Sequence, residues 1–250
     1  MSQASLELRS ITLTIGGAHI LRGVDLDVAG GELIGVIGPN GAGKTTLFNV
    51  ISGLVRPTGG QVVFDGRDVT RDRVAQRARA GLGRTFQTSS LFPGLSVREN
   101  VRLAAQERLG RALSLVRFPR SGDEATTIAD DCLTQVGLGH RGDGRAGELS
   151  HGDKRKLEIA VLLAADPSMV LLDEPMAGVA SADVPGLVEV IGGLHAGGRT
   201  VLMVEHHMDV VLGLADRVAV MHRGQLLACD TPAAVMADPE VQSAYLGDVA

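Results

Sequence analysis

The stretch that decides the fold is Gly38-Pro39-Asn40-Gly41-Ala42-Gly43-Lys44-Thr45-Thr46, directly after the apolar run Leu33 to Ile37. It matches the phosphate-binding pattern G-x-x-x-x-G-K-[ST] in a strand–loop–helix setting. Such a loop turns backbone N–H groups and the positive end of a helix towards one point. We therefore expect it to bind the β- and γ-phosphates of a nucleotide, with Lys44 reaching the phosphates and Thr45 ligating Mg²⁺.

The composition limits which other classes of protein this chain can belong to. With 250 residues and 44% hydrophobic residues, the chain has room for one large α/β domain or a core with a small subdomain. The net charge is −5, and scattered Lys and Arg argue against a nucleic-acid surface. Cys132 and Cys229 form no C-x-x-C pattern, which favours a reducing compartment.

The chain also lacks the pattern of a secreted or membrane-spanning protein. Glu7 and Arg9 interrupt the N-terminal segment where a signal peptide would be apolar. No stretch approaches the roughly 18 apolar residues that a spanning helix needs. We expect a cytoplasmic protein whose membrane role, if any, comes from a partner.

The order of apolar patterns predicts an α/β domain. Alternating apolar residues predict strands over 6–15 and 24–28. From Ser150 onwards, helical patterns alternate with buried runs at 169–172 and 200–204, which is typical of a parallel sheet with crossover helices.

The middle of the chain has a different, helical pattern. We interpret residues 97–149 as a helical subdomain inserted into a core formed by about 1–96 and 150–250, within a single domain of residues 1–250.

Two carboxylates follow the buried run that ends at Leu172. Asp173 is placed to hold Mg²⁺ through water, and Glu174 to polarise an attacking water. The alternative is that both residues merely cap a strand before Pro175. Downstream of a phosphate loop, the catalytic interpretation is the stronger one.

Ser150-His151-Gly152-Asp153 precedes a helix with an apolar stripe. Ser150 is suited to the N-cap, and Asp153 favours the helix dipole. Neither role explains Gly152, which costs stability in a first turn. A glycine there indicates that a phosphate approaches the main chain closely.

Two further polar residues follow strands. Gln87 is a candidate neutral ligand for Mg²⁺ or water, and His206 is placed to contact a γ-phosphate. His207 is the obvious competitor of His206, because spacing alone does not choose between them.

Together these segments resemble the nucleotide-binding domain of ABC transporters over essentially the whole chain. Gly38–Thr46 corresponds to Walker A, Gln87 to the Q-loop and Leu149–Asp153 to the signature motif. Val170–Glu174 corresponds to Walker B with its catalytic glutamate, and His206 to the switch histidine.

The resemblance implies a P-loop NTPase fold. The expected architecture is a mixed-sheet core, an N-terminal antiparallel β subdomain and an inserted α-helical subdomain. It further implies an ATPase that uses ATP and Mg²⁺ and works as a pair of cassettes. In such a pair, Ser150 and Gly152 of one cassette contact the γ-phosphate that the Walker A motif of the other cassette holds. His151 and Asp153 would lie at the same interface between the two cassettes.

Finer motifs resemble the ATPases of high-affinity branched-chain amino acid importers. They are Arg84-Thr85-Phe86-Gln87, Leu157-Glu158-Ile159-Ala160, Asp173-Glu174-Pro175-Met176-Ala177-Gly178 and Val204-Glu205-His206-His207-Met208. The implied partners are transmembrane permease subunits, a second ATPase in a hetero- or homodimer, and indirectly a substrate-binding protein. Importers of this type usually pair two different cassettes, at the inner face of the membrane. Urea and short-chain amide importers share much of the pattern.

Three positions depart from the family pattern. Ile15 stands where the family usually has an aromatic residue that stacks on adenine, so we expect weaker adenine binding. His151 and Asp153 replace the usual glycine and glutamine of the signature, which changes the charge at the interface between the two cassettes.

Three other classes of protein share parts of this sequence pattern. A soluble ABC protein of translation or DNA repair usually has two cassettes, a coiled coil or a zinc insertion, and this chain has none of these patterns. An export ATPase shares the chemistry, so only the subfamily resemblance favours import. A kinase on the same loop is disfavoured by the signature and by Glu174.

Overall fold

The computed structural model describes residues 4–85, 91–110 and 123–246. They form two compact units. The first unit comprises Met1–Arg84, Ser168–Pro175 and Leu194–Ala250, and the second comprises Thr85–Pro167 and Met176–Gly193.

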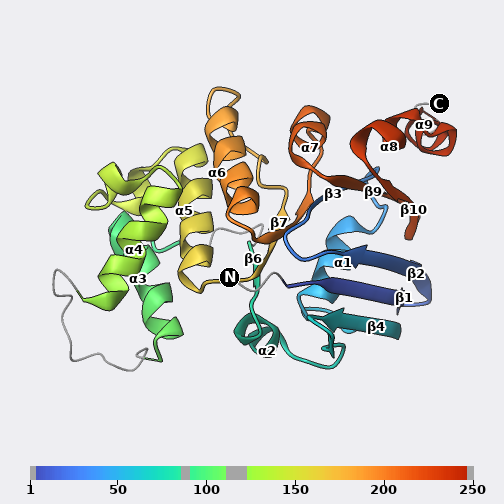
Figure 1. Ribbon diagram of the computed structural model, residues 1–250, viewed down its shortest axis with the longest axis horizontal. Coiled ribbons are helices and arrows are strands. Elements are labelled where there is room, and N and C mark those ends of the chain that lie inside the picture. Colours follow the sequence, from blue (N-terminus) through green and yellow to red (C-terminus); the bar gives the residue numbers. More distant parts are fainter. Residues whose placement is uncertain (1–3, 86–90, 111–122, 247–250) are drawn as a thin grey trace. The chain divides into compact units, whose positions relative to one another are not determined.

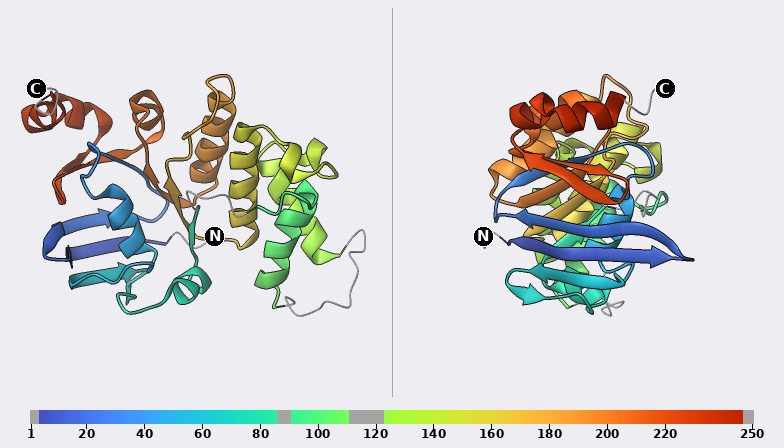
Figure 2. Two further views of the ribbon diagram at one scale, coloured as in Figure 1. Left: turned by 180° about the vertical axis from the view of Figure 1, so that it is seen from behind. Right: turned by 90° about the vertical axis from the view of Figure 1, so that its right-hand side faces the viewer.

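The first unit contains an antiparallel sheet, as the resemblance implies. Its strand order is β2-β1-β4-β5 (Figures 1 and 2). The strands are β1 (Leu6–Ile15), β2 (Ala18–Val28), β4 (Gly59–Phe64) and β5 (Arg67–Asp68). Leu6 pairs with Val28 and Leu8 with Leu26, so the alternating apolar side chains of both strands reach the same buried face.

A second sheet in the same unit is mixed, with the order β10-β9-β3-β8-β7-β6. Its strands are β3 (Leu33–Ile37), β6 (Leu82–Arg84), β7 (Met169–Asp173), β8 (Thr200–Val204), β9 (Arg217–His222) and β10 (Gln225–Asp230). Only β9 and β10 pair antiparallel. Strands β3, β7 and β8 are buried along their whole length, which explains their continuous apolar runs. Because these three are parallel neighbours, the residues that follow them meet at one edge.

The helices of the first unit cover these sheets or connect their strands. They are α1 (Lys44–Ile51), α2 (Val74–Arg79), α7 (Met208–Leu214), α8 (Pro232–Ala237) and α9 (Pro239–Leu246). Aliphatic side chains dominate the core, with Phe48 and Phe64 as its aromatic members.

The second unit is helical. Helices α3 (Val97–Arg108), α4 (Glu124–Gln135) and α5 (His151–Ala164) pack against one another (Figure 1). The single-turn elements η1 (Gly139–Arg141) and η2 (Ala146–Glu148) lead from α4 to α5. Helix α6 (Val184–Ala196) begins in the second unit and ends in the first.

None of the helices in the described part of the chain is both long and apolar enough to cross a membrane.

Candidate ATP and hydrolysis site

The loop between β3 and α1 has the backbone geometry of a phosphate cradle. Gly38 and Gly43 adopt φ of 151° and 100°, which side chains rarely tolerate. A Cβ on Gly38 would lie 2.1 Å from the main-chain oxygen of Met221. Gly43 is the N-cap of α1 and provides no side-chain cap. The first-turn N–H groups of this helix are therefore oriented to bind an anion.

Lys44 is folded back over this loop. Its Nζ donates to the main-chain oxygens of Gly38 at 2.6 Å and Pro39 at 3.0 Å. Burial lowers the pKa of Lys44, and the nearby Glu174 and Asp173 oppose that shift. The ammonium group is thus held at the mouth of the loop by oxygen acceptors that a phosphate can replace.

Asp173 ends β7 as a buried carboxylate paired with Arg84. Oδ2 of Asp173 lies 2.9 Å from Nη2 of Arg84, and the side chains are 0% and 7% exposed. Burial raises the pKa of Asp173, and the Arg84 guanidinium acts in the opposite direction. Nη1 of Arg84 also donates to Asn49 and Ser52 at 2.8 Å each. Arg84 therefore links the end of β6 to α1 and to the Walker B carboxylate.

Glu174 and His206 meet at the ends of β7 and β8. Nε2 of His206 lies 2.9 Å from Oε1 of Glu174. Glu174 has a φ of 50°, a strained conformation for a residue other than glycine that costs about 1–3 kcal/mol. Its N–H donates to the main-chain oxygen of Val204 at 2.9 Å, which holds that conformation in place.

The His207 side chain contacts Glu205 and not Glu174. Its Nδ1 lies 3.1 Å from Oε2 of Glu205, and its side chain is 57% exposed. Of the two histidines, His206 is the one that contacts Glu174.

In the second unit, Ser150 is the N-cap of α5, as predicted. Its Oγ accepts from the N–H of Asp153 at 3.1 Å. A Cβ on Gly152 would lie 2.6 Å from Cβ and 2.8 Å from Oδ2 of Asp183. Packing within the unit thus provides a reason for glycine that the sequence interpretation lacked. Ser150 and His151 are exposed.

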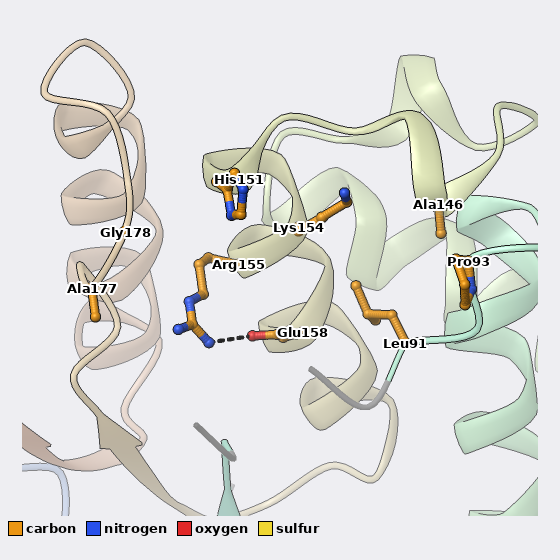
Figure 3. Close-up of a pocket in the computed structure, with 9 residues that line it drawn as sticks. All are labelled: Leu91, Pro93, Ala146, His151, Lys154, Arg155, Glu158, Ala177 and Gly178. Carbon is orange, nitrogen blue, oxygen red and sulfur yellow. Dashed lines mark hydrogen bonds and ion pairs between the residues drawn. The ribbon is translucent and has the colours of Figure 1, made fainter. Parts of the chain in front are cut away.

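A pocket of about 610 Å³ lies beside this helix start, within the second unit. Its lining residues are Leu91, Pro93, Ala146, His151, Lys154, Arg155, Glu158, Ala177 and Gly178. Figure 3 shows that the polar lining comes from α5, with Arg155 bonded to Glu158 at 2.8 Å. The signature turn therefore borders a hollow whose polar side chains carry both signs of charge.

The predicted site residue Ile15 takes part in none of the hydrogen bonds and ion pairs described for these clusters, and Gln87 cannot be placed. Ile15 lies at the end of β1 and is 56% exposed, so it presents an aliphatic surface to solvent. Gln87 lies outside the described residues.

Sequence reasoning did not find Arg84 and Glu205 as parts of the site. Each had a weak signal: Arg84 follows two residues of a short strand, and Glu205 is a charge immediately after the apolar run 200–204. Neither signal identifies the partner: Arg84 meets Asp173 only when β6 and β7 lie side by side, and Glu205 reaches the next two residues only through the turn that follows β8.

Comparisons with known proteins point to one family along nearly the whole chain. The ABC transporter family profile matches residues 21–177, and a profile described as branched-chain amino acid ATP-binding cassette transporter matches residues 225–250. The high-affinity branched-chain amino acid transport ATP-binding protein LivG of Salmonella typhimurium is 37% identical over 99% of this chain and 100% of its own length.

Two further proteins are similar to this chain, one by sequence and one by structure. The lipopolysaccharide export system ATP-binding protein LptB of Acidithiobacillus ferridurans is 38% identical over 97% of each chain. A crystal structure of the ADP conformation of an ATP-binding cassette of an ABC transporter superposes with a TM-score of 0.86 at 33% identity, covering 98% of this chain and 100% of that one. The present chain belongs to the ABC transporter family and is one of its ATP-binding cassettes.

Proposed function

We propose that this cassette hydrolyses ATP to drive the uptake of branched-chain amino acids through partner membrane subunits. The similarity to LivG and the match over residues 225–250 support this substrate class. Because LptB is equally similar, percentage identity alone does not set the direction of transport. The C-terminal match and the motifs around Arg84 and Glu205 are what favour import.

The loop Gly38–Thr46 would bind the triphosphate of ATP. The first-turn N–H groups of α1 bind the phosphate oxygens, and Lys44 exchanges its two main-chain acceptors for them. Ile15 would lie against adenine as an aliphatic surface, in place of an aromatic ring.

The residues near this loop fit a magnesium ion. Thr45 provides a hydroxyl oxygen from the first turn of α1, and Asp173 provides a buried carboxylate at the end of β7. Oxygen ligands of this kind suit Mg²⁺, which usually keeps several waters and few protein ligands. We assign Thr45, Gln87 and, through water, Asp173 to this ion, which when bound neutralises charge on the phosphate oxygens.

The observation that carries the proposed hydrolysis is the 2.9 Å contact between His206 and Glu174. Glu174 orients and polarises the attacking water, and His206 holds the carboxylate of Glu174 in place. The same imidazole is positioned to sense the γ-phosphate. The strained backbone of Glu174 fixes the direction in which its side chain leaves β7.

The signature would act on the ATP of a second cassette. Ser150 and Gly152 contact its γ-phosphate, with His151 and Asp153 beside them. Asp153 adds a negative charge near that phosphate, which Lys154 of the same helix would offset, since Arg155 is already paired with Glu158. The second cassette is either a copy of this chain or a related ATPase.

This cassette would operate at the inner face of the cell membrane, bound to permease subunits. A substrate-binding protein would deliver the amino acid to the permease from the other side.

Reconstitution tests the proposal. The tagged chain is captured from detergent-solubilised membranes of its host, and the co-purifying subunits are placed in vesicles with the binding protein and internal MgATP. We expect ATP-dependent uptake of labelled leucine that is absent with the Glu174→Gln variant. Uptake of urea but not of leucine, or ATP-driven extrusion, would contradict the proposed substrate class or direction.

A further inference from the structure

Glu205 is a buried carboxylate with several hydrogen bonds to the turn that follows it. It comes directly after β8 and is 2% exposed. Its Oε2 accepts from the N–H of His206 at 2.9 Å and from the N–H of His207 at 3.3 Å. The same oxygen lies 3.1 Å from Nδ1 of His207. One carboxylate oxygen therefore binds two consecutive main-chain amides and one imidazole.

These hydrogen bonds add to the main-chain hydrogen bonds from Val210 and Val211 to the oxygen of His207, at 3.1 and 3.2 Å. His207 is the N-cap of α7 and makes no side-chain cap hydrogen bond. The N–H of Glu205 approaches the main-chain oxygen of Val36 at 3.4 Å, so the turn is also attached to the strand that leads into the phosphate loop. The peptide that carries His206 is thereby held at both of its ends.

Fixing this peptide determines which histidine faces Glu174. With both amides bound to Glu205, the His206 ring reaches Oε1 of Glu174 and the His207 ring turns back to Glu205. If the amides were released, rotation of the turn would allow either ring, or neither, to approach Glu174. A displacement of about 1 Å in such a group can cost about 100-fold in rate.

We propose that Glu205 is a positioning residue for hydrolysis: it holds the His206–His207 turn so that His206, and not His207, contacts Glu174. This inference rests on the proposed role of His206. A purely structural role for Glu205, in which it stabilises the turn without any bearing on His206, makes different predictions.

The test is a double-mutant cycle on the full-length cassette, in the assembly in which it hydrolyses ATP. We expect Glu205→Ala to lower kcat by about 10- to 100-fold while the MgATP dissociation constant, measured by fluorescent nucleotide displacement, stays within about twofold. In a His206→Ala background, Glu205→Ala should cause no further loss, because both changes remove the same contact.

Two matched variants separate an effect on the position of His206 from an effect on folding. Glu205→Gln retains an acceptor oxygen and should keep kcat within a few-fold of the wild type. His207→Ala leaves both amide hydrogen bonds to Glu205 in place and removes an exposed ring, so it should change kcat by less than about twofold. If Glu205→Ala does not fold, Glu205→Asp, which retracts the carboxylate, replaces it in the same cycle.

The outcomes distinguish this inference from the proposed function. Additive losses in the cycle, a change confined to KM, or wild-type activity of Glu205→Ala beside an impaired His206→Ala would overturn the positioning role alone. Wild-type activity of His206→Ala would overturn the assignment of His206 itself.

Discussion

The two units of the cassette present their expected ATP-contacting residues in opposite ways. In the first unit, Lys44 and Asp173 are buried, and hydrogen bonds within the unit hold them. In the second, Ser150 and His151 are exposed at the start of α5, where Ser150 is the N-cap. The first unit thus holds the groups that we propose for phosphate binding and hydrolysis, among them Lys44, Asp173 and Glu174. The start of α5 in the second unit is the surface that we propose another cassette contacts.

The largest expected effect concerns the carboxylate at the centre of the first unit. Glu174→Gln removes the charge that we propose polarises the attacking water, so we expect kcat to fall by about 10²- to 10⁴-fold with MgATP affinity preserved. Steady-state ATPase rates and nucleotide titration measure the two quantities separately. Full activity in this variant would show that hydrolysis does not depend on Glu174.

Breaking the buried ion pair of the first unit should cost stability. Arg84→Met leaves Asp173 without the guanidinium in a buried site, and we expect a loss of about 3–5 kcal/mol in the free energy of unfolding at pH 8. The exposed pair Arg67–Asp72 provides the control, since Arg67→Met should cost less than about 1 kcal/mol.

The free energy of unfolding that Arg84→Met loses should depend on pH in a definite direction. Burial already raises the pKa of Asp173, and without Arg84 that pKa rises further. Between the unfolded and the folded pKa, the folded variant binds more protons, so lowering the pH stabilises it. The loss should therefore be smaller at pH 5 than at pH 8 in urea unfolding. A loss that is equal at both values would contradict this explanation.

A smaller effect is expected in the second unit. Ser150→Ala removes the N-cap of α5, which costs about 1 kcal/mol of stability. Because we propose that Ser150 contacts the nucleotide of another cassette, ATPase activity should fall while the MgATP affinity of the isolated chain is unchanged. Thermal melting and nucleotide titration check both parts. A weakened affinity in the isolated chain would remove the distinction between the two units.

The smallest expected effect is on the binding of the adenine ring of ATP. Ile15→Tyr offers an aromatic ring at an exposed position, so we expect MgATP binding to tighten by about 1 kcal/mol in calorimetric titration. Leu54→Tyr, at another exposed apolar position of the first unit, should leave the affinity unchanged. Equal affinities in all three proteins would place adenine away from Ile15.

Much of the fold could be predicted because its signals are local. Continuous apolar runs predicted β3, β7 and β8, and Ser150 predicted the start of α5. The contacts between distant segments could not be predicted in this way. Spacing did not distinguish His206 from His207, and it did not indicate that Asp183 packs against Gly152, since each depends on how separate elements meet.

We propose that the signature of one cassette completes the nucleotide site of a second one, which can be another copy of this chain. Each copy contains both the signature and the nucleotide site, so a two-fold pair completes both sites at once. The most direct test is the solution mass of Glu174→Gln by light scattering with and without MgATP, with nucleotide binding measured in parallel. The account predicts a monomer that becomes a dimer on adding MgATP, and a monomer again when Ser150→Arg is added. A Glu174→Gln protein that binds MgATP and stays monomeric would contradict completion by another copy of this chain and assign the completing signature to a different cassette.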